Sequence, residues 1–331
     1  MSTGRNSTAL VADIGGTNAR FAIAKEGVLQ HQTIEKLPTA DYATLADCVG
    51  DYLERVAESP SEACLAMAGA TTTPELVFSN NHWRFFPEQL GPAMRVQRLI
   101  VINDFTAQAL SITSLETGEC ETLYAASEAA NAPKLVIGPG TGLGVSALIP
   151  SATGYIALAG EGGHATFAAS NPRELAVLDK LQARQAHVAF EYVVSGTGLQ
   201  MTYAALREID GLSPEASDAA TIVAKASQGD AQAVEAVDLL VSNLGRIIGD
   251  YALMLGARGG IYIAGGVLPK LMTQISPSLV LSRLHGRGVV DGYIKEIPVY
   301  LVNAEFGALK GTIAALTQAP MGARIWENSE C

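Results

Sequence analysis

The sequence predicts an α/β protein built from two domains. Segments with strand-like and helix-like patterns alternate along the first part of the chain, and a strand, a glycine-rich turn and a second strand occur near residue 14 and again near residue 140. The chain has 331 residues, which suggests two domains at a prior of roughly 100 to 200 residues each. The repeated pattern indicates a weak internal duplication, with a boundary near residues 112–120.

The first part of the chain contains short apolar runs typical of strands and two stretches with helical periodicity. Strands are expected over residues 10–14, 20–24, 28–37, 64–68 and 99–102, and helices over 42–58 and 107–112. Asn103 and Asp104 follow the last of these strands and precede a helix. Open α/β sheets bind ligands at such junctions.

The second part opens with the repeated motif and then becomes mainly helical. Strands are expected over residues 134–137, 145–149, 260–264 and 298–302, and helices over 174–183, 197–209, 218–225, 231–255, 307–317 and after Pro269. The uncharged run 135–160 is long enough for a membrane span, but its glycines and prolines divide it, so two strands are expected there instead.

Composition excludes several classes of protein. Hydrophobic residues make up 48% of the chain and charged residues 17%, which excludes disordered and collagen-like proteins. The net charge of −11 repels nucleic acids and anionic lipids, so neither a nucleic acid nor a membrane is an expected partner.

The four cysteines are widely and irregularly spaced and form no CxxC pair, so they indicate neither a disulfide framework nor a zinc cluster: Cys48, Cys64, Cys120 and Cys331. Free thiols suit a reducing cytoplasm. The polar segment before residue 10 shows no export signal.

The first glycine motif suits a phosphate. A turn containing Gly15 and Gly16 allows backbone N–H groups and the Thr17 hydroxyl to approach an anion closely. The Asp13 carboxylate faces that anion and would require a divalent cation between them. An ordinary Gly-Gly hairpin is the alternative.

Two further glycine elements follow in the second part of the chain. The turn 138–144 has no lysine and lies between two strands, so it matches neither the Walker A loop nor the dinucleotide fingerprint, which argues against an NAD enzyme. The element 263–267 follows a buried strand and could let a purine ring lie on bare backbone. A tight turn from strand to helix is its alternative.

The strongest catalytic candidate is Asp104. A carboxylate at the carboxyl end of a buried strand can accept a hydroxyl proton, while the neighbouring Asn103 amide orients the substrate. A helix N-cap is the alternative role for this pair.

A second polar group comprises Glu161, His164 and Glu191, whose acceptors and donors suit sugar hydroxyls. The alternatives are a structural hydrogen bond for His164 and a solvated surface position for Glu191. The other histidines show no metal-ligand spacing with His164: His31, His82, His187 and His285.

Taken together, these motifs resemble the bacterial glucokinase family. The motifs that carry the resemblance are DIGGTNAR at 13–20, INDF at 102–105, GPGTGLG at 138–144, GEGGH at 160–164, FEYVVSGTGL at 190–199 and IAGGV at 263–267. The resemblance implies the two-domain actin-like ATPase (ribonuclease H-like) fold with an interdomain cleft, in which a small domain of residues 1–112 and about 306–331 joins a large domain of residues 113–305. It also implies a homodimer.

The same resemblance implies transfer of the γ-phosphoryl group of ATP to the 6-hydroxyl of glucose. Asp104 corresponds to the general base and Asn103 to the residue that binds the 3- and 4-hydroxyls, while Glu161, His164 and Glu191 correspond to those holding hydroxyls on the anomeric side. Asp13 would hold Mg²⁺ through water. The residues that correspond to the ATP site are Ala12, Asp13, Ile14, Gly15, Gly16, Thr17, Gly140, Thr141, Gly142, Gly265 and Gly266.

The sequence departs from the related repressor and sugar-kinase group. No cysteine-rich zinc loop follows His164, and the segment before residue 10 is too short for a helix-turn-helix, so neither structural zinc nor DNA binding is expected. Three alternatives stay open: a kinase for another hexose or an N-acetylhexosamine, a non-catalytic sugar or nucleotide sensor on the same fold, and, less favoured, a phosphatase.

Overall fold

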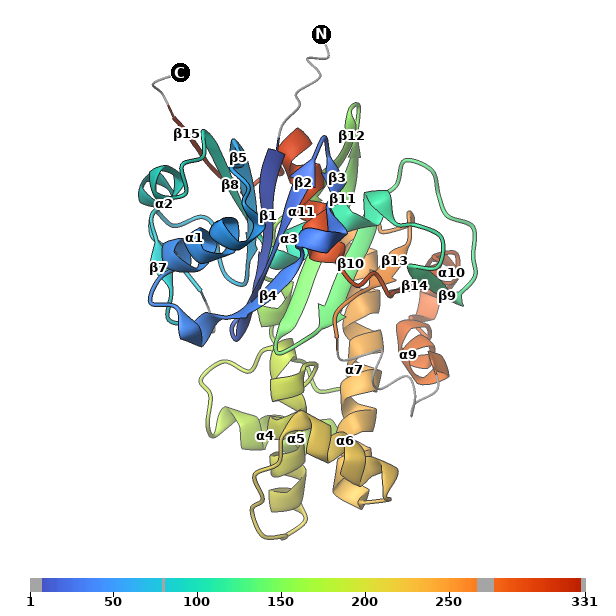
Figure 1. Ribbon diagram of the computed structural model, residues 1–331. Coiled ribbons are helices and arrows are strands. Elements are labelled where there is room, and N and C mark those ends of the chain that lie inside the picture. Colours follow the sequence, from blue (N-terminus) through green and yellow to red (C-terminus); the bar gives the residue numbers. More distant parts are fainter. Residues whose placement is uncertain (1–7, 79–80, 267–276, 329–331) are drawn as a thin grey trace. The chain divides into compact units, whose positions relative to one another are not determined.

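The computed structural model describes residues 8–78, 81–266 and 277–328. They fall into two compact units (Figure 1). Unit 1 takes its residues from the ranges 1–116, 151–159 and 304–331, and unit 2 from 117–150 and 160–303. The predicted division into a small and a large domain stays a prediction, because compactness alone does not make a unit a domain that moves separately.

Unit 1 is built on a seven-stranded mixed sheet in the order β15-β8-β5-β1-β2-β3, with β4 paired to β2. Its strands are β1 (Thr8–Ile14), β2 (Asn18–Lys25), β3 (Val28–Leu29), β4 (Glu35–Pro38), β5 (Glu62–Met67), β8 (Arg98–Asn103) and β15 (Arg324–Glu327). β1 is parallel to β5 and β5 is parallel to β8. The carboxyl ends of these three strands therefore meet at one edge of the sheet.

Both faces of this sheet are covered, as the apolar run of residues 9–12 in β1 requires. Alternate side chains of a strand point to opposite faces, so Leu10 and Ala12 pack toward α1 (Leu45–Val56), whereas Ala9 and Val11 pack toward α11 (Gly307–Thr317). Helix α1 begins at a capping box between Thr44 and Asp47. The other helices of unit 1 are α2 (Pro87–Ala93) and α3 (Asp104–Ser111).

Unit 2 combines a sheet with a larger group of helices. The sheet has the order β12-β11-β10-β13-β14-β9. Its strands are β9 (Cys120–Tyr124), β10 (Lys134–Pro139), β11 (Leu143–Ser151), β12 (Gly154–Leu158), whose residues are counted with unit 1, β13 (Ile261–Ile263) and β14 (Val299–Val302). The helices are α4 (Pro172–Gln182), α5 (Gly196–Ile209), α6 (Ala219–Ser227), α7 (Ala231–Leu255), α9 (Pro277–Leu284) and α10 (Asp291–Lys295).

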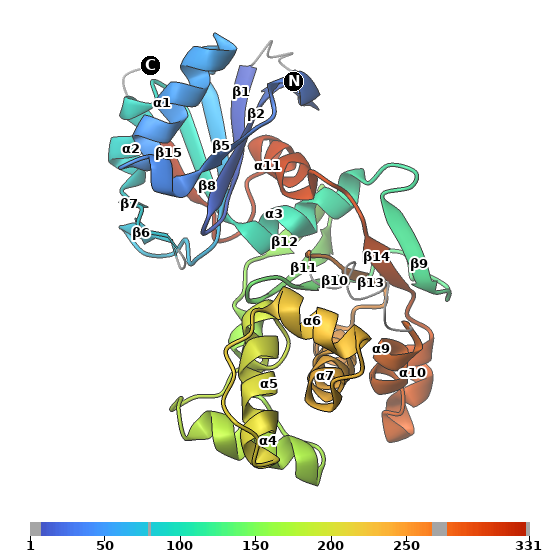
Figure 2. The same cartoon turned by 60° about the horizontal axis from the view of Figure 1, so that its bottom comes forward.

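The core of unit 2 lies mainly along α7. This 25-residue helix packs against α5, α6 and α9, and Figure 2 shows α4 to α7 gathered in one part of the unit. Buried residues of α7 such as Leu240, Leu244 and Ile248 belong to the same hydrophobic cluster as Leu135 and Ile137 of β10. The long helix therefore connects the helical group to the sheet.

Most predicted elements are present with boundaries shifted by a few residues, but the predicted strand 28–37 is wrong. The structure has β3, a 3₁₀ turn at His31–Thr33 and then β4, and both short strands pair with β2. The Thr33 hydroxyl accepts a hydrogen bond from the N–H of Ile23 (2.9 Å). Here a side-chain oxygen of the segment, in place of one of its backbone carbonyls, accepts the hydrogen bond from β2, so the segment does not pair continuously with that strand.

Several elements were not predicted: β9, β12, β15, α2, α9, α10 and the two-stranded ribbon of β6 (Leu76–Val77) with β7 (Arg84–Phe85). The position after Pro269, where a helix was predicted to begin, lies outside the described residues. The uncharged run 135–160 forms β10, β11 and β12, and in the described part of the chain no helix is long and apolar enough to cross a membrane.

Three cysteines lie in the described part of the chain, Cys48, Cys64 and Cys120, and all are free thiols. Burial raises the pKa of Cys48 to about 12 and also raises that of Cys64. The reactive form of cysteine is the thiolate. These two side chains therefore act as small apolar core residues.

Gly311 allows the backbones of α3 and α11 to approach closely, because a Cβ atom at this position would lie 1.8 Å from the Ala107 carbonyl oxygen. We expect Gly311→Ala to lower the free energy of unfolding by about 1–3 kcal/mol, the usual cost of overpacking. Gly50→Ala, at an exposed position of helix α1, is the matched control, since its Cβ would meet nothing within 4 Å. The free energy of unfolding of this control should rise by about 0.5–1 kcal/mol, because alanine has a higher helix propensity than glycine. Urea unfolding measures both, and equal stabilities would contradict the close approach.

Candidate active site

The predicted residues of unit 1 gather at the carboxyl edge of its sheet. Ile14 of β1 is in register with Met67 of β5, and Met67 is in register with Asn103 of β8. Neighbouring strands are about 4.8 Å apart, so β1 and β8 are about 10 Å apart at this edge. Asp13 and Asp104 therefore lie at one end of the same sheet, where α/β proteins of this kind bind ligands.

The turn between β1 and β2 presents backbone N–H groups on one side. Asn81 donates to the Gly15 carbonyl (3.2 Å), and Thr39 donates its hydroxyl to the Gly16 carbonyl (2.9 Å) and its N–H to the Thr17 carbonyl (3.0 Å). In a planar trans peptide the carbonyl and the following N–H point in opposite directions. The three N–H groups that follow these carbonyls therefore face away from Thr39 and Asn81, as an anion site requires.

Asp13 precedes this turn on β1. Its Oδ2 atom lies 3.4 Å from Nη1 of Arg20, and about a quarter of the side chain is exposed. Burial raises the pKa of Asp13, and the charge and hydrogen bond of Arg20 oppose that rise. The described residues contain no cluster of three or more histidine, cysteine or acidic side chains that could enclose a metal ion.

The structure divides the roles of Asn103 and Asp104. Asn103 is the N-cap of α3, since its Oδ1 accepts hydrogen bonds from the N–H groups of Phe105 (2.9 Å) and Thr106 (3.2 Å). Its amide nitrogen donates to the carbonyl of Gly69 (3.3 Å) and carries a second N–H. Asp104 is the first residue of the helix, half-buried, with Oδ1 accepting from the N–H of Phe105 (2.9 Å). The cap role is therefore filled by Asn103.

In unit 2 the glycine turn between β10 and β11 contacts the first turn of α5. The N–H of Gly196 donates to the Gly140 carbonyl (2.9 Å), and the N–H of Thr197 to the Thr141 carbonyl (3.4 Å). By the same peptide geometry, the N–H groups of Thr141 and Gly142 point away from the helix. The positive end of the α5 dipole also lies at this turn, which favours a bound anion.

His164 and Glu191 are brought together by a short antiparallel pairing. Thr166 forms an isolated β-bridge with Ala189, and the 3₁₀ turns Gly162–His164 and Phe190–Tyr192 lie next to it in the chain. Nδ1 of His164 lies 3.5 Å from Oε1 of Glu191. The N–H of Leu143, in the glycine turn, donates to Oε2 of the same carboxylate (3.4 Å). Glu191 is therefore partly buried and hydrogen-bonded to the turn. The alternative of a solvated surface position for Glu191 is wrong.

Glu161 belongs to the same loop as His164. Its carbonyl accepts the N–H of His164 (3.0 Å) at the start of the 3₁₀ turn Gly162–His164. The Glu161 side chain is exposed. The three polar candidates of unit 2 thus belong to two neighbouring loops: Glu161 and His164 to one, and Glu191 to the other.

The third glycine element adjoins the second. The N–H of Ala264 donates to the Ile137 carbonyl (2.8 Å), so the chain leaves β13 beside β10. Gly265 has a φ of 90°, and a Cβ atom there would lie 2.8 Å from the Pro139 carbonyl oxygen. Only glycine satisfies both conditions. Gly266 is exposed beside it, and Val267 lies outside the described residues.

Sequence reasoning missed three residues that hold these loops: Thr39, Asn81 and Ser195. The Ser195 hydroxyl donates to the Glu191 carbonyl (2.6 Å) and accepts from the N–H of Gly198 (2.8 Å), which makes it the N-cap of α5. Its position before a helical stretch was a usable cap signal. Thr39 and Asn81 gave none, because their partners lie 23 and 66 residues away.

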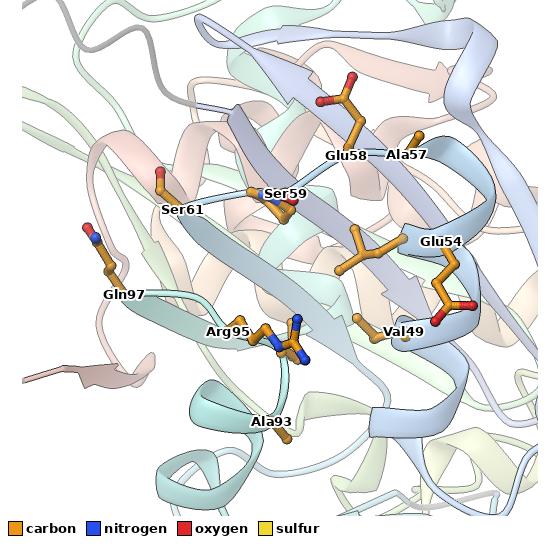
Figure 3. A pocket seen from close by; sticks show the side chains of 13 residues that line it. Val49, Glu54, Ala57, Glu58, Ser59, Ser61, Ala93, Arg95 and Gln97 are labelled. Atoms are coloured by element: carbon orange, nitrogen blue, oxygen red, sulfur yellow. The ribbon is translucent and has the colours of Figure 1, made fainter.

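A cavity of about 710 Å³ in unit 1 contains none of the predicted residues. It is lined by the last turns of α1, the segment 59–61 before β5 and the segment 93–97 before β8. Figure 3 shows Glu54, Glu58 and Arg95 among its side chains. The cavity lies where β5 and β8 begin, at the sheet edge opposite Asp13 and Asp104.

Comparison with known proteins identifies similar chains. A family model described as "Glucokinase" matches residues 10–319. The chain is 40% identical to a glucokinase of Aromatoleum aromaticum over 327 residues, covering 97% of this chain and 99% of that one. It is 39% identical to a glucokinase of Chromobacterium violaceum over 310 residues, covering 93% and 88% of the two chains.

Among solved structures, a glucokinase from an Antarctic psychrotroph has a TM-score of 0.81 and 32% identity, covering 95% of this chain and 99% of that one. Such structures have the two-domain actin-like ATPase fold, which confirms the predicted α/β fold class.

Proposed function

The chain belongs to the glucokinase family, and from that premise we propose which of its residues carry out the reaction. The enzyme transfers the γ-phosphoryl group of ATP to the 6-hydroxyl of glucose. The observation that carries the assignment is the shared carboxyl edge of β1 and β8, which lie about two strand spacings apart, with Asp13 near the end of β1 and Asp104 directly after β8. That separation leaves room for a phosphoryl group between a metal ligand and a base.

Asp104 acts as the general base. It takes the proton of the 6-hydroxyl while that oxygen forms a bond to the γ-phosphorus and the bond to the bridging oxygen breaks, so ADP leaves with the electron pair. The backbone N–H of Phe105 fixes the Asp104 carboxylate through Oδ1. Asn103 uses the second N–H of its amide to orient the 3- and 4-hydroxyls.

The two glycine turns hold the phosphates of ATP. The phosphoryl-transfer transition state is highly anionic, so catalysis depends mainly on positioning and charge neutralisation. The turns contain no lysine, and the chain carries a net charge of −11. Backbone N–H groups from residues 16–18 and 141–142 therefore supply the donors, while Gly265 and Gly266 leave space for the adenosine.

Asp13 fits the role of a Mg²⁺ ligand. Mg²⁺ is usually held by one or two carboxylates together with phosphate oxygens and water. Asp13 supplies one carboxylate beside a turn with the N–H groups of an anion site, and Arg20 contacts it through Oδ2. When bound, the ion would neutralise charge on the phosphates. Asp13 would hold it, through water, against the turn.

Glu161, His164 and Glu191 bind hydroxyls on the anomeric side of the sugar. Their donors and acceptors discriminate sharply, because a sugar lacking the matching hydroxyl leaves polar groups unpaired. The contact of Glu191 with Leu143 supports this assignment, since it connects sugar recognition with the phosphate turn.

The proposal also includes a homodimer in the cytoplasm and the division into a small and a large domain. Buried free thiols at Cys48 and Cys64 support a reducing compartment.

An ADP-release assay with ATP and Mg²⁺ across glucose, mannose, fructose and N-acetylglucosamine tests the function. We expect glucose to give the highest kcat/KM. A higher value for another hexose would identify a different sugar kinase, and absence of turnover with every sugar would indicate a sensor.

We expect Asp104→Asn to lower kcat by a factor of about 10² to 10⁴, the usual contribution of a general base, and to retain glucose affinity. Steady-state kinetics and calorimetric glucose titration measure the two effects. Asp41→Asn, at an exposed position in the turn Thr39–Asp41, is a control that should leave kcat unchanged. Turnover of Asp104→Asn close to that of the unaltered enzyme would remove the base assignment.

We expect Glu161→Gln to raise KM for glucose by at least about tenfold, which corresponds to roughly 1.4 kcal/mol. The carboxylate is a stronger acceptor for sugar hydroxyls than the neutral amide. KM for ATP, measured in the same assays, should stay within about twofold. If KM for glucose does not change, Glu161 does not contact the sugar.

A further inference from the structure

The short ladder that joins His164 to Glu191 contains two backbone hydrogen bonds. The N–H of Phe167 donates to the Val188 carbonyl (2.9 Å), and the N–H of Phe190 donates to the Ala165 carbonyl (2.9 Å). A ladder of this length is not stable by itself. Other groups must therefore fix the separation of its two strands.

Arg246 of α7 lies against an aromatic side chain from each strand. Its guanidinium carbon is 5.4 Å from the ring centre of Phe167 and 5.8 Å from that of Phe190. The two rings contact each other edge to face, with centres 5.6 Å apart. The two distances from the guanidinium carbon to the ring centres lie within the range of cation–π attraction. A single side chain thus holds both strands of the ladder.

The guanidinium is itself fixed in position. Nη1 of Arg246 donates to Oε2 of Glu174 (3.0 Å), and Nη2 donates to Oδ1 of Asn243. The Glu174 side chain is 2% exposed and also accepts hydrogen bonds from the N–H (2.7 Å) and hydroxyl (2.8 Å) of Ser170. Nε of Arg246 is buried, with no hydrogen-bond partner in the described parts of the chain. Such a fixed, planar cation is well suited to position aromatic rings.

We propose that Arg246 is a positioning residue for sugar recognition, because it fixes the ladder that sets the Nδ1 to Oε1 distance between His164 and Glu191. It touches neither of these side chains and acts through Phe190, which directly precedes Glu191, and through Phe167, three residues after His164. This inference rests on the proposed role of His164 and Glu191.

Lysine cannot reproduce this arrangement. A lysine at position 246 would keep the charge opposite Glu174, but a compact ammonium has no plane to pack against two rings. The ladder would then be held less firmly, and His164 and Glu191 would match the sugar hydroxyls less closely. ATP recognition depends on other loops and should change little.

The test uses Arg246→Lys and the double variant Arg246→Met with Glu174→Gln, which leaves no unpaired buried charge. We expect KM for glucose to rise about threefold in the first and at least about tenfold in the second. KM for ATP should stay within about twofold of the unaltered enzyme. Discrimination between glucose and 1,5-anhydroglucitol, which lacks the anomeric hydroxyl, should fall in both variants, an effect that general loss of stability does not produce.

Arg173→Met is the matched control. Arg173 also joins α4 to α7, through Glu235 (2.7 Å), and binds Asp210 (2.8 Å), but none of the contacts found in the described residues connects it to the ladder. We expect this variant to lose thermal stability while its KM for glucose and its sugar discrimination stay unchanged.

Glucose KM within about twofold of the unaltered enzyme in folded Arg246→Lys would overturn the proposal. An equal rise for Arg173→Met would also overturn it, since the effect would then follow stability alone. If the double variant does not fold, Arg246→Lys decides the question. Failure of the proposed function is distinguishable, because the unaltered enzyme would then not phosphorylate glucose at all.

Discussion

The parallel register of β1, β5 and β8 is the constraint on which unit 1 depends. It places the ends of three buried strands at one edge, so that Asp13 and Asp104, which are 91 positions apart in the chain, belong to the same end of the sheet. A shift of one residue in β1 would exchange the side chains that pack toward α1 with those that pack toward α11. Packing on both α1 and α11 therefore fixes the register, and the register fixes the position of the carboxylates.

The two glycine turns proposed to bind phosphate share one electrostatic arrangement. In an acidic chain without lysines in these turns, the positive charge for a phosphate must come from backbone dipoles and a bound cation. In unit 1, Thr39 and Asn81 bind the carbonyls of the turn, and in unit 2 the first N–H groups of α5 do so. In both turns, the N–H group that follows each bound carbonyl therefore points away from the donor that binds this carbonyl. Glycine permits the close approach, but the neighbouring donors set the direction.

The sequence predicted the features that depend on local patterns and missed those that depend on distant contacts. The buried strands β1, β5, β8 and β10 were recognisable because covered parallel strands are continuously apolar. β6 and β7 have only two residues each, too few for any periodicity, and β15 is a strand only because it pairs with β8. In the site, Asp13 and Asp104 stood at recognisable strand ends. Arg246 resembles any helical arginine until its aromatic neighbours are known.

In the proposed function, the residues assigned to sugar and to phosphate share one framework in unit 2. Glu191 accepts a hydrogen bond from Leu143 of the glycine turn, and its carbonyl binds Ser195, the cap of the helix whose first N–H groups hold that turn. A displacement of Glu191 would therefore move both the turn and the start of α5. Since Glu191 is paired with His164 through the ladder, a sugar bound to this pair as proposed would also support the turn between β10 and β11. Under that proposal, binding energy from hydroxyls remote from the reacting oxygen would help to position the phosphate, as efficient catalysis requires.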